Sequence, residues 1–323
     1  MGHARSVQLD LVRRRRLTAL AAVGVLAAVG GAAVGAGDGG GNGDGSVTGA
    51  GATARAAAAR PHAQLPGGGR RLFPDRRVVA FYGNPRDDEL GALGIGTPAQ
   101  AARRLVQQAK PYGRDRRPVL PAMELISTVA TAAPGPSGLY RDQLAFSTIR
   151  RYLKAARRVH ALLILDVQPG RGEFGPEIER LEPFLRQPDV GLALDAEWHV
   201  GADQLPGKAI GSTDADVVNS AARFMGRLVR ERDLPEKLLL VHRFTNDMIA
   251  RPQRLAQVAG VRTVINVDGF GSNTVKIAKY HSFVAGTPRM GRGFKLFYNE
   301  DVKTMTPHQV MALTPRPDVV VYE

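Results

Sequence analysis

The chain has 323 residues, of which 44% are hydrophobic and none is cysteine. The apolar fraction suffices for a folded core, and the lack of cysteine excludes disulfides, thiolate metal sites and a cysteine nucleophile. The net charge of +14 would suit a nucleic-acid-binding protein, but half of it lies in residues 1–77, which hold 11 Lys and Arg against 4 Asp and Glu. No nucleic-acid-binding motif accompanies the remainder, so we expect no nucleic-acid partner.

Residues 1–36 have the pattern of an export signal. Arg13–Arg16 precedes an apolar stretch over residues 17–36 that ends in small residues, as in a secretory signal peptide. The arginine run also matches a twin-arginine export signal. Alternatively, the apolar stretch is long enough to stay in the membrane as an anchor. We therefore expect an extracytoplasmic protein that is secreted or tethered to the cell membrane by its N-terminus.

The next segment changes composition abruptly. Residues 37–77 are rich in Gly, Ala and Arg and show no apolar periodicity, which is typical of a disordered linker. The predicted folded domain is then residues 78–323.

Eight short apolar runs in this domain alternate with segments of helical periodicity. The runs are residues 78–84, 118–126, 161–168, 190–199, 238–245, 263–270, 294–300 and 318–322. Continuous apolar runs are typical of parallel strands buried on both faces. Eight of them in about 250 residues predict an α/β fold of the (β/α)8 TIM-barrel type. The chain stops at Glu323, so we expect the eighth helix to be missing.

Polar residues gather where the predicted strands end, and active sites of this fold form at those ends. The residues are Glu124, Asp166, Gln168, Asp195, Glu197, His199, His242, Arg243, Asp268, Asn299, Glu300 and Asp301. Charged groups are costly to bury unless they are paired or functional. A set of them at one end of the barrel predicts a catalytic or binding site there.

The sharpest motif is Asp195-Ala196-Glu197 at the end of the fourth predicted strand. Strand side chains alternate, so both carboxyl groups should project to the same side. One carboxylate can then hold or raise the pKa of the other, as a general acid at neutral pH requires. Asp166 on the neighbouring strand can support them, and Glu300 on the seventh strand can serve as the second carboxylate of glycoside hydrolysis.

This D-x-E motif resembles that of the chitinases and related barrel lysozymes. The resemblance implies that Glu197 is the proton donor and Asp195 its partner. A Glu at the end of strand four with another at strand seven also resembles the retaining barrel glycosidases, in which Glu300 would be the nucleophile. The longer run of aspartates that precedes the chitinase motif is absent, and Ala196 stands where the retaining enzymes carry Asn.

The remaining candidates would bind the substrate, which we expect to be a carbohydrate of the cell envelope. Tyr82, Trp198 and Tyr298 offer aromatic faces on which sugar rings stack. Arg243 offers a charge for an anionic substrate group or for an internal carboxylate. The other polar candidates for substrate contact are Gln168, His242, Asp268 and Asn299.

Two other functions fit the same residues. A divalent-metal-dependent hydrolase is one, because His199, His242, Asp166 and Asp268 are strand-end residues of types that bind metals. The strand-one H-x-H and the H-E-x-x-H motif of such enzymes are absent, so we expect no metal and no cofactor. The other is a barrel that binds glycan, or acts as an envelope scaffold, without catalysis, since fold does not determine function.

Overall fold

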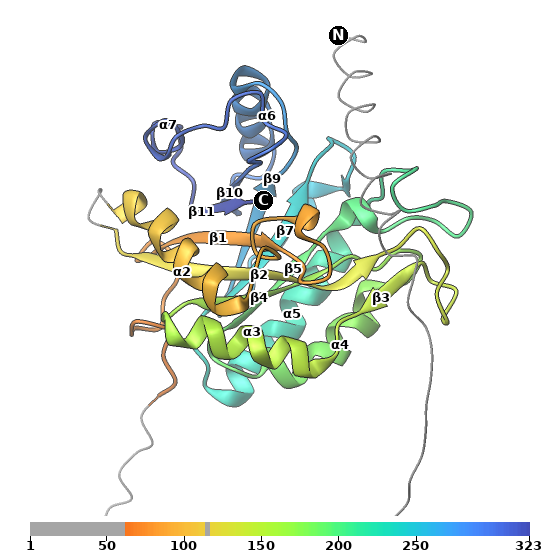
Figure 1. Cartoon of the computed structure of the whole chain (residues 1–323), viewed down its shortest axis with the longest axis horizontal. Coiled ribbons are helices and arrows are strands. Elements are labelled where there is room, and N and C mark those ends of the chain that lie inside the picture. Colours follow the sequence, from red (N-terminus) through yellow and green to blue (C-terminus); the bar gives the residue numbers. More distant parts are fainter. Residues whose placement is uncertain (1–61, 114–116) are drawn as a thin grey trace, which may run out of the picture.

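A computed structural model describes residues 62–113 and 117–323 of the chain. Eight parallel strands close into a barrel, in which β1 pairs with both β2 and β11 (Figure 1). The barrel strands are β1 (Arg77–Gly83), β2 (Val119–Ala130), β4 (Leu162–Val167), β5 (Val190–Leu194), β7 (Lys237–Arg243), β9 (Val261–Val267), β10 (Gly291–Leu296) and β11 (Val319–Tyr322). The predicted TIM-barrel fold is therefore confirmed.

Six α-helices in the described residues follow strands and cover the barrel. They are α2 (Pro98–Ala109), α3 (Phe146–Arg158), α4 (Phe174–Leu185), α5 (Ala215–Arg232), α6 (Asn273–Gly286) and α7 (Pro307–Met311). The Thr-Pro-x-Gln patterns at Thr97 and Thr306 form complete capping boxes at the starts of α2 and α7. Short pieces complete the fold: β3 (Arg141–Gln143), β6 (Thr213–Asp214), β8 (Ile249–Ala250) and the 3-10 turns η1 (Asp88–Leu90), η2 (Lys110–Gly113), η3 (Ala196–Trp198) and η4 (Pro252–Arg254).

The strands divide their side chains between two apolar layers. Side chains such as Leu163 and Leu165 on β4 face the helices, whereas Leu162 and Ile164 face the barrel interior. The same alternation holds around the barrel, because successive side chains of a strand point to opposite faces. Continued along β4, it turns Asp166 inward. The inner layer is thus apolar near the strand starts and charged near the strand ends.

The expected linker ends earlier than predicted. Leu65, Leu72 and Phe73 are buried and belong to the same cluster as the inner side chains at the strand starts. Residues 62–76 therefore pack against the N-terminal end of the barrel, and the prediction of disorder is wrong for them because their few apolar residues find a partner there. Residues 37–61, and the expected signal or anchor in residues 1–36, lie outside the described residues.

Two predicted elements differ from the structure near the site. The fourth strand ends at Leu194 rather than at residue 199, and Ala196–Trp198 form the turn η3. After β7 the described chain forms β8 and η4 but no α-helix before β9, since residues 244–260 have no helical apolar repeat. Among the described residues, no helix combines the length and the apolar character needed to span a membrane.

Candidate active site

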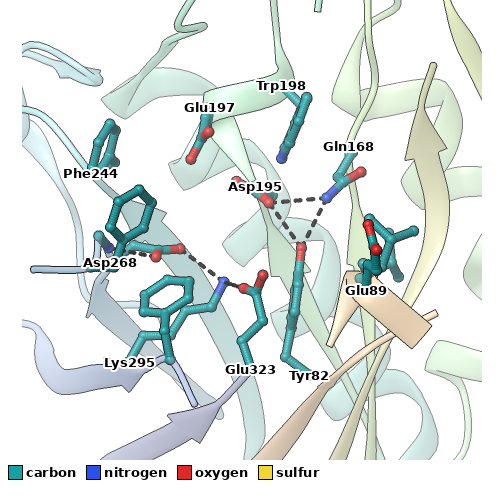
Figure 2. A pocket seen from close by; sticks show the side chains of 15 residues that line it. Tyr82, Glu89, Gln168, Asp195, Glu197, Trp198, Phe244, Asp268, Lys295 and Glu323 are labelled. Carbon is teal, nitrogen blue, oxygen red and sulfur yellow. Dashed lines mark hydrogen bonds and ion pairs between the residues drawn. The ribbon is translucent and has the colours of Figure 1, made fainter. Parts of the chain in front are cut away.

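A pocket opens at the C-terminal ends of the barrel strands. Its lining residues come from all eight barrel strands and the loops that follow them (Figure 2). They are Tyr82, Glu89, Leu90, Ile126, Gln168, Asp195, Glu197, Trp198, Phe244, Asp268, Gly269, Phe270, Lys295, Phe297 and Glu323. The pocket is thus both acidic and aromatic.

Asp195 is held at the floor of this pocket by two neutral donors. The Tyr82 hydroxyl donates to Asp195 Oδ2 over 3.1 Å, and Gln168 Nε2 donates to the same oxygen over 3.3 Å. Gln168 also donates to the Tyr82 oxygen over 2.9 Å, and its own amide oxygen accepts from the Ala130 backbone N–H. This closed set of bonds fixes the Asp195 carboxyl group in one orientation.

Glu197 reaches the pocket from a different element than expected. Because β5 ends at Leu194, the alternation of side chains along a strand does not apply to Glu197. The turn η3 positions this side chain instead. The side chain of Glu197 is nearly buried and lines the pocket next to Trp198. Figure 2 shows Glu197 and Trp198 along one side of the pocket, with Lys295 and Glu323 along the other. The structure therefore brings Asp195 and Glu197 to one pocket.

Lys295 carries a buried positive charge at the opposite wall. Its Nζ lies 3.1 Å from Asp268 Oδ2 and 2.7 Å from Glu323 Oε2, and it stands 3.8 Å from the centre of the Tyr82 ring. Two carboxylates and an aromatic face offset the cost of burying the ammonium group.

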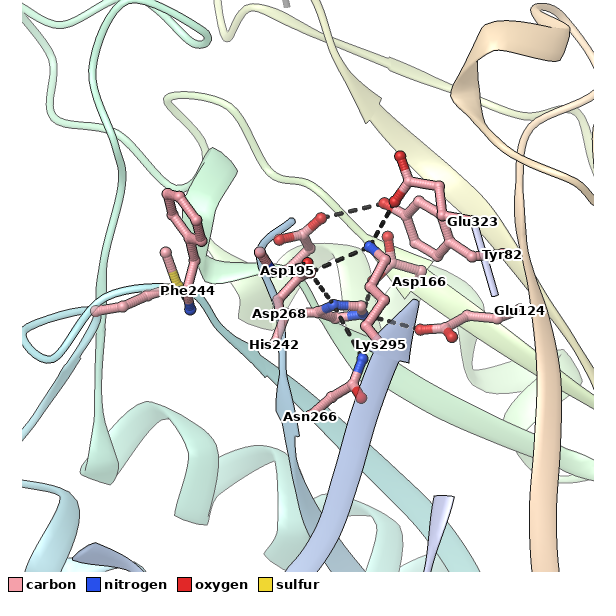
Figure 3. A network of polar contacts seen from close by, with 12 residues as sticks. Tyr82, Glu124, Asp166, Asp195, His242, Phe244, Asn266, Asp268, Lys295 and Glu323 are labelled. Atoms are coloured by element: carbon pink, nitrogen blue, oxygen red, sulfur yellow. Dashed lines mark hydrogen bonds and ion pairs between the residues drawn. The ribbon is translucent and has the colours of Figure 1, made fainter. Parts of the chain in front are cut away.

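A second group of residues lies beneath the pocket around His242. His242 Nδ1 is 2.8 Å from Asp268 Oδ2, and Nε2 is 2.9 Å from Glu124 Oε1 (Figure 3). Asp166 Oδ1 lies 3.9 Å from the same Nε2. Glu124, Asp166 and His242 are completely buried, and they do not line the pocket.

Burial and charge shift the proton affinities of these groups in different directions. Burial, followed by the charge of Asp195, raises the pKa of Asp166 well above its usual range. Burial also raises the pKa of Asp195, against the effects of His242 and Lys295. Burial alone would raise the pKa of Asp268, but Lys295 and His242 outweigh it and lower that pKa. The pocket therefore holds Asp195, whose raised pKa favours the protonated form, and Asp268, whose lowered pKa favours the ionised form.

His242 and Tyr82 are shifted as well. Burial would lower the pKa of His242, but the charge of Asp195 and the hydrogen bonds to Asp268 and Glu124 outweigh burial and raise it. Burial raises the pKa of Tyr82, and the surrounding carboxylates add to this effect. The tyrosine hydroxyl is thus a stable hydrogen-bond donor to Asp195.

Several sequence-predicted residues lie outside the pocket. Glu300 is half-buried, because β10 ends at Leu296 and residues 298–300 form a turn that leaves the pocket. Tyr298 is exposed and stacks on Tyr322, and Asn299 is exposed. Arg243 packs over the Phe283 ring and donates to the Asn246 carbonyl.

His199 is also remote from the His242 group. Its Nε2 lies 3.6 Å from Glu173, and its Nδ1 contacts the Ser212 carbonyl oxygen. Of the four residues that suggested a metal-dependent hydrolase, the structure thus brings together His242, Asp166 and Asp268.

Sequence reasoning missed Lys295, Glu323 and Glu89 among the polar pocket residues. Lys295 had a signal, because a single lysine interrupts the apolar run Phe294–Phe297, and a charge within a buried strand requires a partner. Glu89 belongs to the turn η1 after β1, where no motif marks it. Glu323 follows β11 directly and reaches the pocket from the last strand.

No protein-family model matches this chain, and no curated protein matches it either. The resemblance to barrel glycosidases therefore depends on the fold and on the residues of the pocket.

Proposed function

We propose that this protein is an exported hydrolase that cleaves glycosidic bonds of a cell-envelope carbohydrate, with Glu197 as the general acid and Asp195 as its partner. One observation carries the proposal: Asp195 and Glu197 line the same pocket at the catalytic end of a TIM barrel, together with Trp198 and three phenylalanine side chains. Carboxyl pairs catalyse glycoside hydrolysis, and aromatic faces accommodate the apolar faces of sugar rings.

The chemistry divides among the carboxyl groups of the pocket. Glu197 lines the pocket and would donate a proton to the leaving oxygen of the glycosidic bond. Asp195, held in place by Tyr82 and Gln168, would be the partner carboxyl group of Glu197. Asp268 lines another side of the pocket and has a lowered pKa, so an ionised carboxylate is available to stabilise the positive charge that develops on the sugar.

Asp268 replaces Glu300 in this scheme. The sequence prediction assigned the second carboxylate to Glu300, which does not line the pocket. Asp268 follows β9 and is anchored by Lys295, His242 and the Gly269 N–H. A carboxylate with three donors keeps its place and its charge during a reaction.

Export remains a prediction from residues 1–36. A carbohydrate of the cell envelope is the substrate class that an extracytoplasmic barrel with this pocket would meet. The apolar stretch at residues 17–36 would hold the barrel close to that substrate if it stays in the membrane.

The test compares wild type with Glu197→Gln on peptidoglycan and on chitin, with release of reducing ends as the readout. The substitution keeps the size of the side chain and removes the proton donor. We expect the rate to fall by about 10²–10⁴-fold, the usual contribution of a general acid. Glu300→Gln is the matched control and should retain activity. Binding of glycan without turnover by wild type would favour the non-catalytic alternative.

A further inference from the structure

We propose that Glu124, Asp166 and His242 form a site for a divalent cation in the barrel interior, one layer below the pocket. One carboxylate oxygen from each acid and one ring nitrogen of His242 lie within 4.8 Å of one another. The proposal does not depend on glycoside hydrolysis, because these side chains do not line the pocket in which the substrate would bind.

The distances are close to those between the ligands of a six-coordinate ion. With bonds of about 2.1 Å, neighbouring ligands of an octahedral ion lie about 3.0 Å apart and opposite ligands about 4.2 Å apart. Glu124 Oε1 is 2.9 Å from His242 Nε2, and Asp166 Oδ1 is 3.9 Å from that nitrogen. The first pair fits neighbouring ligands, and the second falls between the two values. All three ligand atoms lie within 4.8 Å of one another, so binding one ion requires them to move by less than about 1 Å.

Unsatisfied oxygens are the second observation. Among the described residues, neither carboxylate oxygen of Asp166 has a hydrogen-bond partner, and the same is true of Glu124 Oε2 and Asp195 Oδ1. All three acids are buried. A buried polar atom without a partner is costly, and a cation bound between Asp166 and Glu124 would supply a partner for their carboxylate oxygens.

His242 is oriented as a metal-binding histidine. Asp268 Oδ2 is 2.8 Å from its Nδ1, and Asp268 is itself held by Lys295. In metal sites a carboxylate commonly accepts the Nδ1–H of a ligating histidine, which turns the Nε2 lone pair toward the metal. Here Nε2 faces Glu124 and Asp166, and a bound cation would replace the proton that Nε2 shares with Glu124 Oε1. Asp268 is thus a positioning residue for the cation site.

The charges of the interior also favour a cation. Five carboxyl groups surround two basic side chains in this part of the barrel: Glu124, Asp166, Asp195, Asp268 and Glu323 around His242 and Lys295. A divalent cation would favour the ionised form of the carboxyl groups that it contacts and would offset the repulsion between them. Two carboxylates with one imidazole suit Mn²⁺, which accepts both oxygen ligands and octahedral geometry.

The experiment titrates MnCl₂ into chelator-treated full-length protein and follows the EPR signal of free Mn²⁺. We expect one saturable site in wild type. Asp166→Asn and Glu124→Gln should weaken Mn²⁺ binding by more than 10-fold, and Asp268→Asn by about 10–100-fold, as removal of an outer-shell partner does. Asp189→Asn is the control, because Asp189 is a buried acid at the other end of the barrel, paired with Arg157. Its binding should equal that of wild type.

A second measurement needs no variant and so does not depend on variant folding. Pulsed EPR of wild type loaded with Mn²⁺ should show the coupling of a coordinated imidazole nitrogen. Either of two results overturns the proposal: no saturable site at about 1 mM Mn²⁺, the weak end for protein sites of such cations, or a bound ion without nitrogen coupling. Equal affinity in wild type and Asp166→Asn would overturn it as well.

Discussion

Lys295→Met tests how the barrel tolerates the charges of its interior. Lys295 is 3% exposed, and its ammonium group contacts two carboxylates that are themselves nearly buried, at 2.7 and 3.1 Å. Methionine fills most of the same volume but leaves Asp268 and Glu323 without this partner. Removing one member of a buried ion pair destabilises a protein by about 3–5 kcal/mol, whereas total stability is about 5–15 kcal/mol.

Urea unfolding followed by circular dichroism measures this loss. With a slope of about 2–3 kcal/mol per M, the midpoint of Lys295→Met should lie about 1–2.5 M below that of wild type. Lys154→Met, at an exposed position on α3, is the control and should change stability by less than about 0.5 kcal/mol.

A double-mutant cycle with Glu323→Gln isolates the pair. In the Lys295→Met background the carboxylate of Glu323 has lost this cation, so neutralising it should be less harmful than in wild type. We expect a coupling energy of about 1–3 kcal/mol. The reasoning would be refuted by a Lys295→Met protein as stable as wild type, or by additive effects of the two substitutions.

Two further predictions concern the scaffold. Burial lowers the pKa of Lys237 to about 7, against about 10.4 for an ordinary lysine, so the unfolded chain binds more protons than the folded protein between these values. The stability of wild type should therefore rise relative to that of Lys237→Met as the pH increases from about 7 to 9.5. Urea unfolding of both proteins at both pH values measures this difference. The same change of stability with pH in the two proteins would contradict the prediction. Thr97→Ala removes the capping box of α2 and should lower the free energy of unfolding by about 1 kcal/mol, as measured by urea unfolding. Thr148→Ala, within α3, is the comparison. An equal loss of stability in Thr148→Ala would argue against a specific effect of capping.

The barrel could be predicted from the sequence because each strand is a short apolar run with a clear end. Period-two alternation then turns Asp166 and His242 inward along their strands, and Asp195 follows β5 in the same phase. The alternation argument failed for Glu197, because β5 ends three residues before it. The residue reached the pocket nonetheless, since the turn η3 returns its side chain to the barrel mouth.

Long-range partners could not be predicted. Glu300 and Asp268 both lie at the end of a predicted strand, and only the closed barrel shows that the turn after β10 carries Glu300 away from the pocket while Asp268 stays in it. The pairing of Lys295 with Glu323 joins two neighbouring strands at their ends, which no local pattern reveals. Residues 62–76 were likewise expected to be linker, because their apolar residues are too sparse to show a period.

The most direct test of the proposed function is a crystal structure of Glu197→Gln with a chitin oligosaccharide. The account predicts a sugar ring against Trp198 and a glycosidic oxygen within hydrogen-bond reach, about 2.6–3.2 Å, of the side chain at position 197. Asp268 should lie beneath the ring carbon of the scissile bond. An oligosaccharide bound away from residues 195–198, or a pocket that excludes the sugar at saturating concentration, would contradict it.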